Sequence, residues 1–217
     1  MILIGLQEFK IDPSDYYQCI FLGENIIFIV YVNDCLLFSK KEKFIDALVE
    51  QMRHHKFELK YEDQSINCFL GLDITMTGTG NNKNIMFKMA HRIDRLLVLA
   101  GMTGCTPKDT PSIQTPLCSD IYGAPHKEYD KWNYAATVVI LQYLSRNDRP
   151  GTELAVNQVV CHTHNPKLSH DIAIKRICRY LKGTRDEGLI FKPNEILNMV
   201  CYIDADFAGI WHVKNTK

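Results

Sequence analysis

The stretch of residues 101–127 divides the sequence into two parts with different patterns. It contains four prolines, Pro107, Pro111, Pro116 and Pro125, which exclude a regular helix because proline has no backbone N–H to donate. We therefore expect an irregular connection there, together with a domain boundary. The part before it mixes strand-like and helical patterns and the part after it is mainly helical, so the sequence predicts an α+β fold.

Two apolar runs, residues 26–31 and 35–38, flank Val32, Asn33 and Asp34. Asn and Asp favour turns because their side chains can bond to nearby backbone groups and tolerate the left-handed region. The pattern predicts a β-hairpin with Asn33 and Asp34 at its tip. A carboxylate at such a tip can bind a hard divalent cation, although for an isolated hairpin turn propensity alone explains the pair.

Apolar periodicity and turn residues predict the remaining elements. We expect Ser39 to cap a helix over residues 40–55. The other expected elements are strands at 57–61, 69–75 and 85–89, a short helix at 91–99, helices at 129–146, 152–163 and 169–181, and strands at 188–192 and 197–203.

The overall charge is balanced, with 25 Lys and Arg against 25 Asp and Glu. Nucleic-acid binding would therefore need a locally basic surface. The apolar opening residues meet Glu8 too soon to form a signal sequence or a membrane span, so no membrane partner is expected. Eight cysteines occur without a Cys-x-x-Cys pair, which favours reduced thiols and an intracellular location, in cytoplasm or nucleus.

Several segments resemble one known family, in the order in which the family has them. Ile-Val-Tyr-Val-Asn-Asp-Cys-Leu-Leu-Phe at 29–38 resembles the Tyr-x-Asp-Asp hairpin of reverse transcriptases. Phe-Leu-Gly-Leu-Asp-Ile at 69–74 and Thr-Pro-Leu at 115–117 are similar to later segments of copia-type retrotransposon enzymes. Ala-Ile-Lys-Arg-Ile-Cys-Arg-Tyr-Leu-Lys-Gly-Thr at 173–184 is the most specific match, and residues 201–209 resemble the start of the linked ribonuclease H domain.

This resemblance to a copia-type reverse transcriptase covers nearly the whole chain. It implies a partial right-hand polymerase palm, an antiparallel sheet with helices, over residues 1–118. It further implies a helical thumb or connection segment over 119–192 and a truncated start of ribonuclease H over 193–217. In the family the hairpin carboxylates hold Mg²⁺ or Mn²⁺, which makes Asp34 the expected metal ligand. Asp204 matches the first metal-binding aspartate of ribonuclease H.

The sequence departs from the family at the hairpin. Asn33 stands where the family has the first aspartate, and a neutral amide offers one carbonyl oxygen and no negative charge to a cation. The chain is also expected to lack the upstream palm aspartate, the fingers and the later ribonuclease H carboxylates. We therefore expect a fragment of an RNA-directed DNA polymerase that is catalytically inactive and retains primer-template binding.

One helix face could hold the phosphate backbone of the primer-template. Lys175, Arg179 and Lys182 recur at four- and three-residue spacing, with Arg176 beside them, as on a polymerase thumb. A solvated basic face is the alternative interpretation, and Asp171 would dilute the patch.

Two other interpretations stay open on the sequence. The chain could be a structural or interaction protein derived from a retroelement, self-associating through exposed apolar surface. It could equally be a slice of a longer, working polyprotein in which Asn33 is tolerated. The cluster of Cys161, His162, His164 and His170 does not match the usual spacing of a zinc site, so we expect no metal there.

Overall fold

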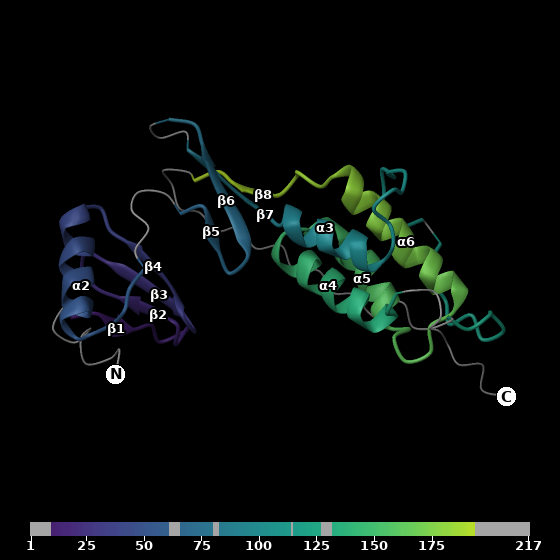
Figure 1. Cartoon of the computed structure of the whole chain (residues 1–217), viewed down its shortest axis with the longest axis horizontal. Coiled ribbons are helices and arrows are strands. Elements are labelled where there is room, and N and C mark those ends of the chain that lie inside the picture. The colour runs from purple at the N-terminus through teal and green to yellow at the C-terminus, as the bar shows by residue number, and fades with distance from the viewer. Residues whose placement is uncertain (1–9, 61–65, 80–82, 114, 127–131, 194–217) are drawn as a thin grey trace. The chain divides into compact units, whose positions relative to one another are not determined.

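The computed structural model describes residues 10–60, 66–79, 83–113, 115–126 and 132–193. The chain divides into two compact units, Met1–Leu70 and Gly71–Lys217, and each is described by itself. Both combine antiparallel strands with helices, so the α+β class is confirmed (Figure 1). The boundary expected after residue 118 falls inside the second unit.

The described residues of the first unit include a four-stranded antiparallel sheet and helix α2. Its strands follow the order β1-β2-β3-β4, and their bounds are β1 Asp12–Pro13, β2 Ile20–Leu22, β3 Ile27–Tyr31 and β4 Asp34–Phe38. Helix α2 (Glu42–His54) buries Leu48 and Met52 in a cluster with Phe28 from the central strand β3. Leu48 and Phe28 are almost completely removed from solvent, so this contact forms the core of the unit.

Helix α2 starts two residues later than the sequence predicts. Lys41 is the N-cap residue, and its side chain makes no capping hydrogen bond. Ser39 accepts a hydrogen bond from the Lys41 backbone N–H at 3.2 Å and donates to the Asn25 carbonyl at 2.7 Å. The prediction that Ser39 caps the helix is therefore wrong, because its hydroxyl forms a local turn and ties the start of α2 to the β2–β3 connection.

The second unit contains an antiparallel sheet in the order β6-β7-β8, with β6 Leu72–Thr77, β7 Asn84–Lys88 and β8 Leu189–Phe191. The short strand β5 (Cys68–Phe69) lies near the end of the first unit. The β6–β7 hairpin was predicted. The strand expected at 69–75 is interrupted, because Leu70 and Gly71 both have positive φ, 53° and 78°, and form a tight turn. Residues 57–60 form no strand, contrary to expectation.

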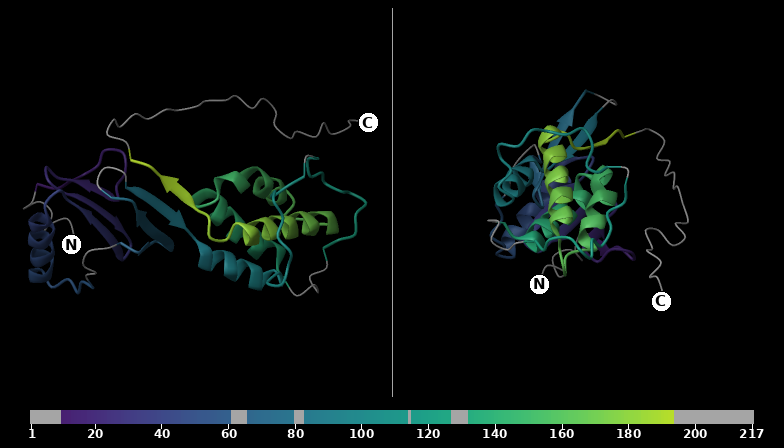
Figure 2. Two further views of the ribbon diagram at one scale, coloured as in Figure 1. Left: turned by 90° about the horizontal axis from the view of Figure 1, so that it is seen from above. Right: turned by 90° about the vertical axis from the view of Figure 1, so that its right-hand side faces the viewer.

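The helices of the second unit form a closed bundle. They are α3 (Ala90–Leu99), α4 (Tyr134–Asn147), α5 (Glu153–Val160), which follows a 3₁₀ turn at Pro150–Thr152, and α6 (Leu168–Gly183). Helix α3 packs on α4 and α6, and α5 packs on the same two helices. Figures 1 and 2 show the bundle and the chain leaving α6 to become β8.

The bundle core is made of the apolar positions that the helical periodicity indicates. Ile93, Leu141, Leu144, Val156 and Ile174 are completely buried. The N-terminus of α4 is capped by Asn133, whose side chain accepts from the Ala136 N–H at 2.9 Å. All four expected helices of this part are therefore confirmed, with boundaries shifted by a few residues at either end.

No helix among the described residues has the length and apolar character that crossing a bilayer requires. The strand expected at 188–192 is confirmed as β8, whereas the one expected at 197–203 lies outside the described residues, as does Asp204.

Candidate functional site

The β3–β4 hairpin differs by one residue from its predicted form. Tyr31 pairs with Asp34 across the strands, so Val32 and Asn33 make the turn and Asp34 is the first residue of β4. The prediction that Asn33 and Asp34 form the tip is therefore correct for Asn33 only. Val32 has a φ of 55°, a conformation that costs a β-branched residue energy.

The hairpin offers a cation little more than one carboxylate. Asp34 and its neighbours from Tyr31 to Cys35 are exposed, and Asn33 contributes at most an amide oxygen. No group of three His, Cys, Asp or Glu side chains that could share a metal occurs in the part of the chain that the structure describes. The described residues therefore do not fit a two-metal polymerase centre.

The Cys35 thiol lies beside this carboxylate. Partial desolvation, and secondly the negative charge of Asp34, raise the pKa of Cys35 above its ordinary value. A thiol with a raised pKa is mostly protonated at neutral pH and is a poor nucleophile. The raised pKa favours the protonated thiol over the reactive thiolate.

The basic side chains of α6 lie close together as predicted, but several of them already form hydrogen bonds within the chain. The Lys182 ammonium donates to the carbonyls of Thr103 and Cys105 at 2.6 and 2.8 Å. Arg179 donates from Nε to the Thr106 carbonyl at 2.6 Å. These bonds hold the proline-rich stretch against α6, a role that the sequence did not indicate.

Arg176 makes a third such contact, whereas Lys175 makes none that the structure shows. One terminal nitrogen of Arg176 donates to the Thr110 hydroxyl at 2.7 Å. The Lys175 residue is half-buried. Its ammonium makes no hydrogen bond or ion pair with another described residue. Of the four predicted phosphate-binding residues, Lys175 is the one without a hydrogen bond or ion pair to another described residue.

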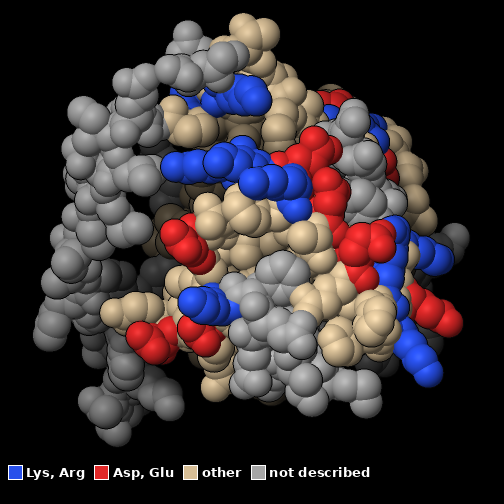
Figure 3. All heavy atoms as spheres, turned by 90° about the vertical axis from the view of Figure 1, so that its left-hand side faces the viewer, with Lys and Arg blue, Asp and Glu red and all other residues tan. Residues whose placement is uncertain are grey.

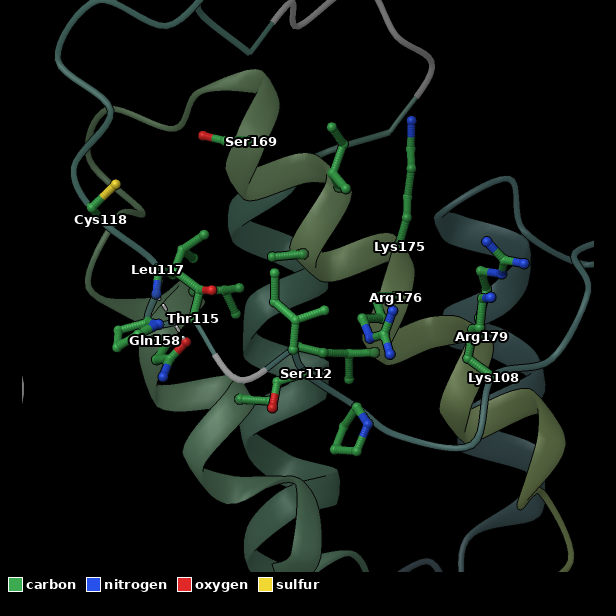
Figure 4. Close-up of a pocket in the computed structure, with 18 of the residues that line it drawn as sticks. Lys108, Ser112, Thr115, Leu117, Cys118, Gln158, Ser169, Lys175, Arg176 and Arg179 are labelled. Atoms are coloured by element: carbon green, nitrogen blue, oxygen red, sulfur yellow. Dashed lines mark hydrogen bonds between the residues drawn. The ribbon is translucent and has the colours of Figure 1, made fainter.

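A groove lies beside this basic face, with a volume of about 550 Å³. Residues 108–113 and 115–118 of the proline-rich stretch form one side, and α5 and α6 form the others. Figure 4 shows Lys175, Arg176 and Arg179 following α6, with Leu117 and Gln158 across from them. The Leu117 backbone N–H donates to the Gln158 side-chain oxygen at 3.3 Å, which fixes the Thr-Pro-Leu segment at the groove.

Asp171 does not dilute the basic face as expected, because its side chain is buried. It pairs with His126 at 2.8 Å, and only 2% of the Asp171 side chain is exposed. The His126 ring also contacts Trp132 and Tyr134 edge to face. The pair therefore ties the end of the proline-rich stretch to α6, and no local pattern in the sequence could have linked two residues so far apart.

The C-terminal end of α6 is held by a second set of charges. Arg185 forms a two-point ion pair with Asp94 of α3, with distances of 2.7 and 2.6 Å. The hydrogen bond from Arg185 lowers the pKa of Asp94. Arg149, also buried, donates to the Thr184 and Arg185 carbonyls. These contacts stabilise the bundle and leave their groups unavailable for a ligand.

Two residues of the histidine cluster, His162 and His170, make structural contacts. His170 is completely buried, and its Nδ1 accepts from the Lys167 N–H while its Nε2 donates to the Cys118 carbonyl, both at 2.9 Å. The His162 ring stacks on it with centroids 4.0 Å apart. Both nitrogens of His170 are occupied, so this side chain has no lone pair left for zinc.

Comparison with known proteins gives the family. The chain is 31% identical over 188 residues to the retrovirus-related Pol polyprotein from transposon RE1 of Arabidopsis thaliana, covering 86% of the chain and 12% of the polyprotein. It is also 31% identical to an uncharacterized mitochondrial protein of the same plant, covering 83% of the chain and 71% of that protein. The chain belongs to the family of retrovirus-related Pol polyproteins of transposons. The resemblance to copia-type retrotransposons is thereby confirmed.

A more distant Pol polyprotein, from transposon TNT 1-94 of Nicotiana tabacum, is 27% identical over 91% of the chain. The chain spans 12% of the RE1 polyprotein and 15% of the TNT 1-94 polyprotein. No protein-family model and no solved structure matches it. On the face shown in Figure 3, basic and acidic side chains adjoin one another.

Proposed function

We propose that the chain is the part of a copia-type RNA-directed DNA polymerase that follows the fingers, with primer-template binding retained and polymerisation lost. The observation that supports it is the β3–β4 hairpin, in which a neutral Asn33 precedes the single carboxylate of Asp34. Two metal ions need several carboxylates to hold them, so losing one charge here lowers both metal affinity and charge stabilisation.

The proposed primer-template contact is the basic face of α6. The Lys175 ammonium makes no hydrogen bond to another described residue. Arg176, Arg179 and Lys182 contribute charge while part of their hydrogen-bonding capacity holds residues 103–110. A phosphate backbone is attracted by all four charges, but a direct contact is easiest at Lys175. Residues 119–192, which carry this face, correspond to the thumb or connection segment of the proposal.

Fluorescence anisotropy of a labelled RNA–DNA primer-template over a salt series tests the binding. Wild-type affinity is expected to fall steeply with salt because phosphate contacts release counterions. Lys175→Gln is expected to weaken binding and to lower the slope of log affinity against log salt by about 1, the value for one phosphate contact.

Lys192→Gln is the matched control, because it makes the same change at an exposed lysine beyond β8. It should leave affinity and slope at the wild-type values. Absence of binding by a folded wild-type chain, or equal effects of the two substitutions, would oppose the proposal.

The second candidate is an interaction protein, and the sheet of the first unit favours it. Leu22, Ile27 and Phe38 are neighbours in register across three strands, and each is more than two-fifths exposed. Such a contiguous apolar face is typical of a surface that another chain covers. If the chain self-associates and does not bind the primer-template, the interaction-protein function is favoured over the polymerase-derived one.

A further inference from the structure

The groove that residues 108–113 and 115–118 form with helices α5 and α6 has an apolar lining. Its floor includes Val159 and Ile177, which are buried, and its walls include Ile113 and Ile172, which are 63% and 62% exposed. Large aliphatic side chains at a concave surface gain free energy when another apolar group removes them from water. A groove of this volume is in the usual range for a bound ligand or for the anchoring side chains of a peptide.

Positive charge gathers around this apolar lining. Lys108, Lys175, Arg176 and Arg179 all line the groove, and Asp120 is the acidic residue among its lining. Asp120 already accepts a hydrogen bond from the Ser169 hydroxyl at 2.6 Å. The groove therefore offers a net positive rim to any ligand that enters it.

Two donors at the groove have no acceptor among the residues that the structure describes. One is the Lys175 ammonium, and the other is Nε of Arg176, which is buried and makes no hydrogen bond. A carboxylate from a ligand can pair directly with the Lys175 ammonium, whereas the buried Arg176 Nε becomes available only if its side chain moves. These donors lie on consecutive residues of α6, beside the aliphatic wall formed by Ile172.

We propose that this groove is a docking site for a partner protein's peptide segment in which acidic and aliphatic side chains alternate. The aliphatic side chains enter between Ile113 and Ile172, and a carboxylate pairs with Lys175 and Arg176. Nucleic acid fits the lining less well, because the aliphatic walls offer nothing to phosphate. No aromatic side chain occurs among the described lining residues to stack on a base.

The test uses the full chain and fluorescein-labelled short peptides. A peptide in which Glu and Leu alternate is expected to bind at least about tenfold more tightly than peptides that alternate Lys with Leu or Glu with Ser. Equal binding of the Glu–Leu and Lys–Leu peptides would overturn the proposal, and so would equal binding of the Glu–Leu and Glu–Ser peptides.

The groove shares Lys175, Arg176 and Arg179 with the proposed primer-template face, so substitutions in its apolar wall distinguish the two sites. Ile113→Ser is expected to reduce affinity for the Glu–Leu peptide about five- to tenfold and to leave primer-template affinity unchanged, because it removes apolar wall without removing charge. Ile121→Ser is the matched control, since Ile121 is 75% exposed in the same stretch but does not line the groove.

The two proposals can fail separately. Loss of primer-template binding with Ile113→Ser would assign the groove to nucleic acid and overturn the peptide proposal. Peptide binding that is unaffected by Ile113→Ser would also overturn it. Absence of primer-template binding by a chain that binds the Glu–Leu peptide would overturn the proposed polymerase-derived function and leave the docking site standing.

Discussion

At the scale of single residues, the proposed loss of polymerase activity depends mainly on Asn33. Asparagine and aspartate have nearly the same shape, so Asn33→Asp should leave the β3–β4 turn intact while adding one negative charge. The variant would then present two carboxylates at the hairpin, and the described residues provide no third group near enough to complete a metal cluster. We expect neither wild type nor Asn33→Asp to extend a primed RNA template with Mg²⁺ or Mn²⁺.

Primer extension on a denaturing gel measures this, with an active reverse transcriptase as the positive control for the template. Primer-template affinity should be measured on the same preparations, so that missing product is not mistaken for missing substrate. A template-dependent product from wild type would contradict the loss of catalysis. If the Asn33→Asp variant makes product and the wild type does not, the missing negative charge at residue 33 is sufficient to explain the loss of polymerisation.

At the scale of elements, periodicity predicted the helices and failed at turns and long-range contacts. Helix α6 was predicted within two residues because its apolar positions repeat along one face. The position of Asp34 was missed because turn propensity does not decide which two residues of Val32, Asn33 and Asp34 make the turn. The bonds from Lys182 to Thr103 and Cys105 were missed because they join positions far apart in sequence.

The Leu70–Gly71 turn is an element whose residue requirement is testable. Gly71 has a φ of 78°, where an L side chain costs about 1–2 kcal/mol. An added Cβ would also lie 3.2 Å from a terminal nitrogen of Arg92, which can move aside. Gly71→Ala is therefore expected to lower the free energy of unfolding by about 1–2 kcal/mol, measured by urea denaturation.

Gly104→Ala is the control for this substitution. Gly104 has ordinary φ, and a Cβ there would meet nothing within 4 Å. Alanine should leave stability unchanged or raise it slightly, because it restricts the unfolded chain without straining the folded one. Equal losses in the two variants would mean that the positive φ at Gly71 is not what requires glycine.

At the scale of the whole molecule, two compact units with separate cores predict two unfolding transitions. Leu48 of α2 and Leu141 of α4 are both almost fully buried, one in each core. Replacing either by alanine should destabilise its own unit by about 2–5 kcal/mol, because the cavity is felt locally. In differential scanning calorimetry, Leu48→Ala should lower the temperature of one unfolding transition and Leu141→Ala that of the other.

A single transition whose temperature falls equally with both substitutions would contradict this prediction. The two units would then unfold as one cooperative structure, and binding by the second unit would depend on the stability of the first.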